Sequence, residues 1–124
     1  MISKQEAVEK LVRQYKKHGT LYVAFDFDDT VKNYLDCTPN QEVIDLLKWS
    51  YHVNCTLILF TCREGERLKE AMDWCTLQGI NFHYANCNPE IVIGGRKPYY
   101  NILLDDKAGL NEAVEVLTKT LDRL

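Results

Sequence analysis

The amino-acid sequence predicts an α/β fold, a three-layer Rossmann-like sandwich with a mainly parallel central sheet. Short runs that are apolar on both faces, such as residues 21–25 and 55–60, alternate along the chain with segments of helical periodicity. Strands of this kind, separated by helices, are typical of parallel sheets covered on both sides. The chain has 124 residues without repeats or linkers, so we expect one domain, residues 1–124.

The first helix is predicted to follow Ser3 and to end at Gly19. Ser3 and Glu6 have the spacing of a capping box, and glycine is the usual residue of a left-handed C-cap. The β-branched and aromatic residues of 21–25 then favour a buried strand. Residues 29–38 show no clear period and are expected to form a loop.

Two further helix–strand boundaries are marked by capping and turn residues. Thr38 is the expected N-cap of the next helix, with Pro39 as its first residue, because proline suits that position. The apolar run 55–60 predicts a second strand. A helical pattern over 66–78 follows, and Gly79 ends it.

The C-terminal part of the sequence predicts two more strands and a last helix. Residues 80–85 and 101–105 are the expected strands, and the helix starts at about Leu110. The segment 86–98 between the two strands resembles a loop, although residues 91–93 are also compatible with a short strand.

Composition and charge exclude several classes of protein. A formal net charge of −3 gives no extended basic surface for nucleic acid, but it remains compatible with a small phosphorylated ligand. The polar N-terminus is unlike a signal peptide, and no run reaches the ~18 apolar residues of a membrane helix. An odd number of cysteines without a C-x-x-C pair predicts reduced thiols in a cytoplasmic protein: Cys37, Cys55, Cys62, Cys75 and Cys87.

Acidic residues gather where the predicted strands end. Asp26, Asp28 and Asp29 follow the first strand, and Asp105 and Asp106 follow the last one. Open parallel sheets bind ligands outside the carboxyl ends of their strands. Carboxylates crowded together repel one another, and a hard divalent cation such as Mg²⁺ offsets this repulsion and lowers their pKa values. The sequence therefore predicts a Mg²⁺ site that includes Asp26 and Asp105.

The order of these features resembles the haloacid dehalogenase superfamily of phosphohydrolases. An apolar strand followed by D-x-D-x-T covers residues 23–30, and an apolar strand that ends in threonine covers residues 57–61. The family's lysine matches Lys97, and its final strand with two acids matches residues 102–106. The stretch GRKPYYNILLDDKA resembles the small bacterial and phage members. The four motifs occur in the family's order and span most of the chain.

The resemblance implies a role for each matched residue. Asp26 would be the nucleophile, and Asp28 would be the general acid that later acts as a base. Thr61 and Lys97 would bind the transferring phosphoryl oxygens. Mg²⁺ would be held by Asp26, the backbone carbonyl of Asp28, Asp105 and, directly or through a water, Asp106.

The expected activity is that of a Mg²⁺-dependent phosphatase that hydrolyses phosphate monoesters through an aspartyl-phosphate. A carboxylate nucleophile splits one difficult displacement into two easier ones. A lysine, a hydroxyl and a metal compensate the charge of the phosphoryl group in flight. Thr30, the last residue of D-x-D-x-T, is expected to support the loop. Asp29 stands where many relatives have glycine and is expected to be a solvated residue or to help shape that loop.

Family members often carry a cap domain, and this sequence leaves no room for one. The segment before the helix near Pro39 is too short, and the segment from Cys62 to Arg96 is filled by a helix and a strand that the core itself needs, so an open site is expected. Residues 32–36 are the expected substrate-facing loop, with Arg63 and Glu64 opposite.

The sequence leaves the partner and two other functions open. A phosphorylated small molecule is the favoured substrate, and a phosphorylated macromolecule is the alternative. A phospho-receiver signalling domain has a similar length and alternation, but its acceptor aspartate ends the middle strand, where this chain has Thr61. A catalytically weak fold of the same family, used as a binding module, is the other alternative.

Overall fold

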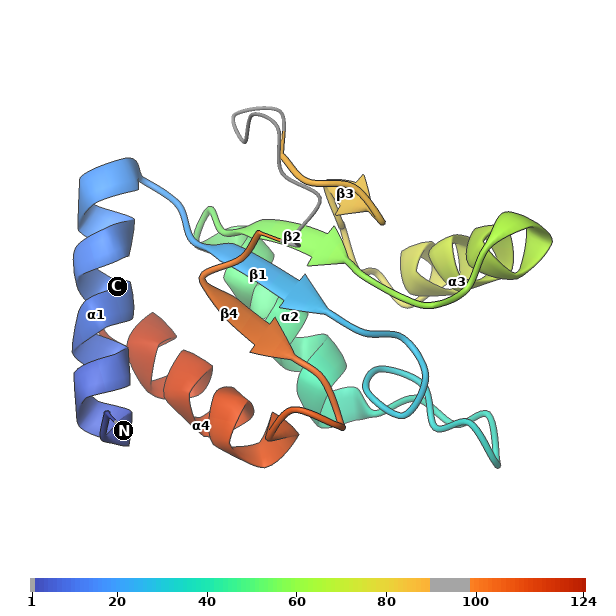
Figure 1. The fold of residues 1–124 in the computed structure, drawn as a ribbon, viewed down its shortest axis with the longest axis horizontal. Coiled ribbons are helices and arrows are strands. Elements are labelled where there is room, and N and C mark those ends of the chain that lie inside the picture. The colour runs from blue at the N-terminus through green and yellow to red at the C-terminus, as the bar shows by residue number, and fades with distance from the viewer. Residues whose placement is uncertain (1, 90–98) are drawn as a thin grey trace.

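The computed structural model describes residues 2–89 and 99–124 and has the predicted α/β fold (Figure 1). Within these described residues, four strands form one sheet in the order β3-β2-β1-β4, and every neighbouring pair is parallel. Helices flank the sheet in the manner of a Rossmann-like three-layer sandwich. The elements are α1 (Lys4–His18), β1 (Tyr22–Phe25), α2 (Gln41–His52), β2 (Thr56–Leu59), α3 (Gly65–Leu77), β3 (Tyr84–Ala85), β4 (Ile102–Leu104) and α4 (Leu110–Leu121).

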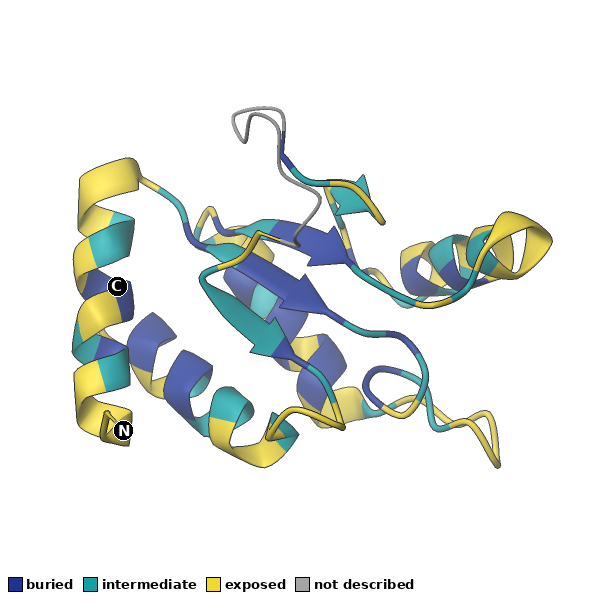
Figure 2. Cartoon of the chain, viewed as in Figure 1, coloured by how far each residue is buried: buried dark blue, intermediate teal, exposed yellow. Residues whose placement is uncertain are grey.

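The core lies between the two central strands and the inner faces of the helices (Figure 2). Phe25 of β1 and Leu59 of β2 are opposite one another in the sheet, and both side chains are fully buried. Leu47 of α2 and Leu117 of α4 are also fully buried in the same cluster. Helix α1 packs on α4, while α2 packs on β2 and α4. Packing of these apolar faces holds the sheet in place.

The first helix begins and ends as the sequence predicts. The Ser3 hydroxyl oxygen accepts a hydrogen bond from the backbone N–H of Glu6 at 3.1 Å. Gly19 adopts the left-handed conformation, with φ of 75°, and its N–H donates to the Tyr15 carbonyl at 2.7 Å. These contacts satisfy backbone groups that a helix end leaves without intrahelical partners.

The predicted start of α2 is wrong by two residues. Asn40 occupies the N-cap position, and the helix begins at Gln41 rather than at Pro39. The reason is local, because the Thr38 N–H and hydroxyl both donate to the Asp36 carboxylate, at 3.1 and 2.6 Å. The Asn40 N–H donates to the carbonyl of Val31, so the chain stays tied to the preceding loop up to that point.

Strand β3 is shorter than predicted. Only Tyr84–Ala85 pair with β2, whereas the sequence predicted a strand over residues 80–85. The N–H of Ile80 still donates to the Cys75 carbonyl, which keeps the chain in the turn that ends α3. The tentative strand at 91–93 lies outside the described residues.

Neither described part of the chain contains a cap domain, as predicted. The segment between β1 and α2 holds only turns and isolated bridges. The five cysteines are free thiols, also as predicted. None of the helices in the described residues is long and apolar enough to cross a membrane.

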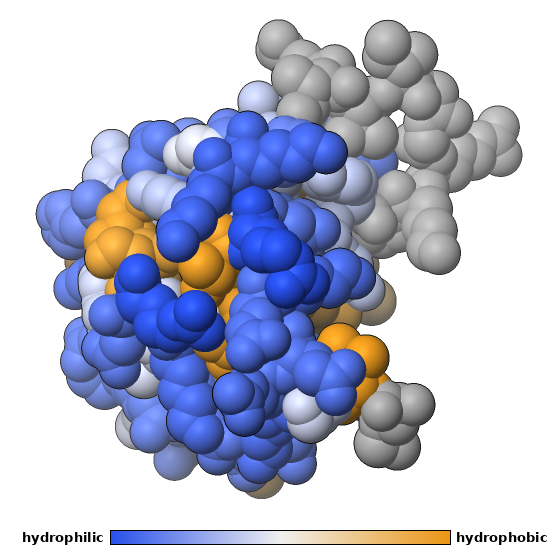
Figure 3. All heavy atoms as spheres, turned by 90° about the vertical axis from the view of Figure 1, so that its left-hand side faces the viewer, coloured by the Kyte–Doolittle hydropathy of each residue, from blue (hydrophilic) through white to orange (hydrophobic). Residues whose placement is uncertain are grey.

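One hollow lies away from the strand ends, between α1, β4 and α4. It has a volume of about 390 Å³, and hydrophobic side chains show between hydrophilic ones on the face that carries α1 (Figure 3). Its lining is mostly apolar and includes Leu11, Ile102 and Val116. The acids predicted for the site, Asp26, Asp105 and Asp106, lie elsewhere, at the carboxyl ends of the strands.

Leu117→Ala tests the importance of the core between α4 and the sheet. We expect a loss of about 2–5 kcal/mol in the free energy of unfolding, because the side chain is fully buried. Urea unfolding followed by circular dichroism measures this loss. Leu77→Ala is the matched control, since Leu77 is 84% exposed and its loss should change stability by less than about 0.5 kcal/mol. Equal effects of the two substitutions would contradict the described packing.

Candidate active site

Three strand ends meet at one edge of the sheet and bring the predicted acids together. The parallel register places Phe25 of β1 beside Leu104 of β4, so the next residues of both strands emerge at the same level. The Asp26 N–H extends this pairing by donating to the Leu104 carbonyl at 3.0 Å. Carboxylate oxygens of Asp26, Asp105 and Asp106 all lie within 4.8 Å of one another. The structure thus brings together acids that are about eighty residues apart in the sequence.

The loop after β1 holds the Asp26 side chain in place. One Asp26 carboxylate oxygen accepts the N–H of Phe27 at 2.8 Å. The Phe27 carbonyl accepts the N–H of Val31 at 3.1 Å, which closes a tight turn. Asp29 has a positive φ of 59°, and its carboxylate accepts the N–H of Tyr34 at 2.9 Å. Asp29 therefore shapes the loop, one of the two roles that the sequence allowed.

Thr30 joins the two halves of the site. Its side chain is fully buried, and its hydroxyl oxygen accepts the backbone N–H of Asp106 at 3.1 Å. This bond links the loop after β1 to the residues that follow β4. The Lys107 N–H donates to the Asp105 carboxylate at 2.9 Å and orients the second acid. Thr30 supports the loop, as the resemblance implied.

Crowding and burial change the protonation of Asp26. Burial, opposed by the hydrogen bond from the Phe27 N–H, and then the nearby Asp105 and Asp106 carboxylates raise the pKa of Asp26 to about 6 from an ordinary value of 3.8. The pKa of Asp106 is also raised, first by burial and then by Asp105. Both shifts mean that negative charge in this cluster is destabilised by its surroundings. A bound cation would lower these pKa values.

Asp28 has a different partner and the opposite shift. Its two carboxylate oxygens accept hydrogen bonds from Nε and Nη2 of Arg63, at 2.9 and 2.8 Å. The bonds from Arg63 lower the pKa of Asp28, so this carboxylate is ionised in the structure. The sequence predicts Arg63 opposite the substrate-facing loop 32–36, and the bond from Arg63 to Asp28 was not predicted.

Thr61 lies at the end of β2 beside the acids, as predicted. Its N–H donates to the side-chain oxygen of Asn86 at 2.8 Å, and its hydroxyl accepts the N–H of Arg63 at 3.2 Å. The Asn86 amide also donates to the Arg63 carbonyl at 3.2 Å. Asn86 was not predicted as a site residue. It directly follows β3, and residues in this position of a parallel strand lie at the edge of the sheet where the site forms.

A hollow of about 150 Å³ is lined by Asp26, Asp106 and Thr61, and Asp105 is not part of its lining. Lys97, the predicted phosphate-binding lysine, lies outside the described residues, so its position relative to the acids stays a prediction. Lys107 also lines this hollow, and no role was predicted for it from the sequence. The lining residues are Asp26, Asp28, Asp29, Thr61, Cys62, Asp106 and Lys107.

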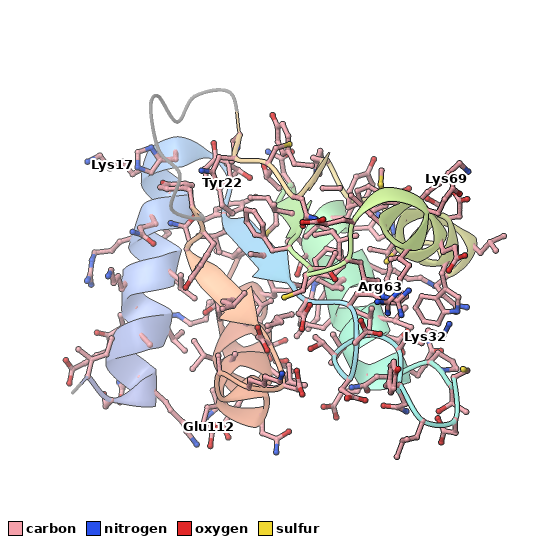
Figure 4. All side chains as sticks on the ribbon, turned by 45° about the vertical axis from the view of Figure 1, so that its right-hand side comes forward. Lys17, Tyr22, Lys32, Arg63, Lys69 and Glu112 are labelled. Atoms are coloured by element: carbon pink, nitrogen blue, oxygen red, sulfur yellow. The ribbon has the colours of Figure 1, made fainter. Side chains whose placement is uncertain are left out.

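A second hollow, of about 320 Å³, is lined by Arg63, the residue that binds the Asp28 carboxylate. The guanidinium of Arg63 lies 4.7 Å from the ring centre of Phe27, and the Lys32 ammonium lies 5.6 Å from the ring centre of Trp74. Figure 4 shows Arg63 and Lys32 between the loop that follows β1 and helix α3. Glu70 also lines this hollow, so it offers aromatic surface and charges of both signs.

Comparison with known proteins supports the fold and adds no activity. No family model matches the chain, and no curated protein matches it. A solved structure described as a conserved protein of Bacteroides thetaiotaomicron matches with a TM-score of 0.68. The identity is 27%, and the match covers 81% of this chain and 91% of that one. Fold and site together thus define an α/β protein with a carboxylate cluster at the carboxyl edge of its parallel sheet.

Two neighbouring substitutions should change stability in opposite directions. The pKa of Asp26 is raised, which means that the folded protein favours the protonated side chain. Protonated Asp26 therefore stabilises the fold at low pH, and this contribution is lost as the pH rises through about 6. In chelator at pH 8, Asp26→Asn should therefore raise the free energy of unfolding by about 1 kcal/mol, and the gain should vanish by pH 4. Urea unfolding across this pH range measures the effect.

Asp28→Asn is the matched comparison at the other carboxylate. The pKa of Asp28 is lowered, so the pair with Arg63 stabilises the protein at neutral pH, and this contribution is lost as the pH falls through the lowered pKa. This variant should be less stable than the unchanged protein at pH 8. Effects of the same sign for both substitutions would refute the described charge environments.

Proposed function

We propose that this protein is a Mg²⁺-dependent phosphatase of the haloacid dehalogenase superfamily. One observation carries the proposal: carboxylate oxygens of Asp26, Asp105 and Asp106, from two parallel strands, lie within 4.8 Å of one another. Thr61, from a third strand end, lines the same small hollow as Asp26. The free thiols support a cytoplasmic location as part of this proposal.

The donor set in the cluster fits a hard divalent cation. All three donors are carboxylates, which suit Mg²⁺, and the raised pKa of Asp26 indicates charge that a cation would compensate. Bound there, Mg²⁺ would neutralise part of the charge on the acids and on a phosphoryl group beside them. Asp26, Asp105 and Asp106 would hold it.

The residues of the hollow divide the chemistry between two carboxylates. In the first step, an Asp26 oxygen attacks phosphorus, the bond from phosphorus to the leaving oxygen breaks, and Asp28 gives its proton to that oxygen. In the second step, water attacks the aspartyl-phosphate, Asp28 takes a proton from the water, and the Asp26 carboxylate is released with inorganic phosphate. The Thr61 hydroxyl and Lys97 would bind the phosphoryl oxygens.

The side of the site near Asp28 is the natural place for the leaving group, because Asp28 must reach the leaving oxygen. The hollow beside Arg63 lies on this side and has an aromatic lining from Trp74 and Phe27. Its volume falls within the range of small-molecule sites. A phosphorylated small molecule with a cyclic leaving group is therefore the favoured substrate.

The ion pair between Arg63 and Asp28 favours a second candidate function. It lowers the pKa of Asp28, and a group that stays ionised is a poor proton donor. A catalytically weak binding module of the same fold would tolerate such a pair. The two functions differ in what happens to Asp28 when substrate binds. In a phosphatase, the negative charge of the bound phosphoryl group raises the pKa of Asp28, so that it can carry a proton.

Phosphate release from an aryl phosphate tests the proposed activity. Release should require Mg²⁺, stop in chelator and fall by more than about 1,000-fold in Asp26→Asn, because the nucleophile is lost. Colorimetric phosphate detection measures it, and Asp45→Asn on the exposed side of α2 is the matched control. Equal release by the Asp26→Asn variant would refute the role of Asp26. A folded protein that binds Mg²⁺ but releases no phosphate would favour the binding module.

Trp74→Ala tests where the leaving group lies. We expect kcat/KM for a phosphate monoester with a cyclic leaving group to fall about two- to tenfold, because the contact between this ring and Trp74 is lost. Glycerol phosphate, which has no ring, should be hydrolysed as before. Steady-state kinetics on both substrates measure the difference. Tyr51→Ala removes an exposed aromatic ring of α2 that is not part of the hollow and should change neither rate. An equal loss for both substrates would place the leaving group elsewhere.

A further inference from the structure

Asp28 lies beside the carboxylate cluster, yet its side chain is not part of it. It lines the same hollow as Asp26 and Asp106, and its charge contributes to the raised pKa of Asp26. The group of oxygens close enough to share a cation contains Asp26, Asp105 and Asp106 only, among the residues that the structure describes. Something therefore holds the Asp28 carboxylate away from a site that would attract it once a cation was bound.

The contact that holds Asp28 is the guanidinium of Arg63. Both Asp28 oxygens are used, one by Nε at 2.9 Å and one by Nη2 at 2.8 Å. A bidentate arginine fixes the plane of a carboxylate as well as its position. Neither oxygen can turn toward the cluster unless at least one of these bonds breaks.

Arg63 is itself held firmly. Its backbone N–H donates to the Thr61 hydroxyl, and its carbonyl accepts from the Asn86 side chain. Its guanidinium packs 4.7 Å from the ring centre of Phe27, and only 13% of its side chain is exposed. A residue fixed at both its backbone and its side chain can position another group accurately.

We propose that Arg63 is a positioning residue that keeps the Asp28 carboxylate out of the metal cluster and leaves it available to the leaving group. The proposal rests on the proposed function: its first part on the metal site alone, and its second part on the phosphatase chemistry as well. A fourth carboxylate on the cation would tighten binding and would remove the group that exchanges protons with the leaving oxygen and with water. Arg63 thus favours turnover at the expense of metal affinity.

Calorimetric titration with Mg²⁺ tests the first part without any substrate. Arg63→Met keeps the packing against Phe27 and releases Asp28, so the dissociation constant for Mg²⁺ should fall on the order of tenfold. Arg67→Met is the matched control, because Arg67 acts on Asp28 through charge and makes no hydrogen bond to it among the described contacts. This control should tighten binding only about twofold, since its exposed charge is screened.

Asp28→Asn distinguishes a new ligand from a lost positive charge. Alone, it should leave the dissociation constant for Mg²⁺ within about twofold, because Asp28 does not bind through its side chain. Combined with Arg63→Met, it should cancel the tighter binding. A gain that survives in the double variant, or that Arg67→Met reproduces in full, would overturn the proposal. Unchanged affinity in a folded Arg63→Met variant, or no Mg²⁺ binding by the unchanged protein, would also overturn it.

Arg63→Lys keeps the test decisive if Arg63→Met fails to fold. Lysine keeps the charge but cannot hold both oxygens in one plane, so intermediate tightening is expected. Phosphate release is a separate readout, and Arg63→Met should lower kcat about 100-fold through loss of acid–base catalysis. Tighter Mg²⁺ binding without any phosphatase activity in the unchanged protein would support the positioning role while refuting the proposed function.

Discussion

The parallel pairing of β1 with β4 is the constraint on which the candidate site depends. These two strands are far apart in the sequence, and their register alone sets residues 26 and 105 at the same level. The backbone bond from Asp26 to Leu104 and the bond from Asp106 to the buried Thr30 hydroxyl maintain this level beyond the strands. A slip of one residue would turn the acid side chains to opposite faces of the sheet. Packing of apolar residues on both strands therefore decides the electrostatics of the site.

Two carboxylates separated by one residue have opposite environments at this edge. Asp26 is half-buried beside other acids, whereas Asp28 accepts two hydrogen bonds from a guanidinium. Phe27 between them is buried in the core, and each carboxylate has its own partner: the Phe27 N–H for Asp26 and the Arg63 guanidinium for Asp28. The chain thus places one carboxylate within the acidic cluster and holds the other on a guanidinium. The guanidinium of Arg63 packs over the ring of the same Phe27.

The sequence predicted most of the fold because its signals were local and strong. The apolar runs around Val23 and Leu57 and the glycine at position 19 each act within a few residues. The start of α2 and the extent of β3 depended on contacts from elsewhere. Hydrogen bonds from Asn40 to the preceding loop delay the helix, and pairing with β2 limits the strand.

The sequence predicted the acids of the candidate site but not the hydrogen bonds that join its side chains. Asp26, Asp105 and Thr61 follow apolar strands, which places them at one edge by topology. The bonds from Arg63 to Asp28 and from Asn86 to Thr61 depend on side-chain directions in loops, and no periodicity reports those directions. Lys97 was identified by its place in a motif, and its geometry lies outside the described residues.

The crowded acids have a consequence for how long the protein survives in a cell. Without a cation, the repulsion around Asp26 opposes the folded state, and a ligand that binds only that state adds stability in proportion to the logarithm of its concentration. Proteases act on the unfolded fraction, which grows as that stability falls. Under the proposed function, the lifetime of the protein would follow the supply of Mg²⁺, because a shortage of the ion would lower the amount of folded protein as well as the fraction that carries the ion.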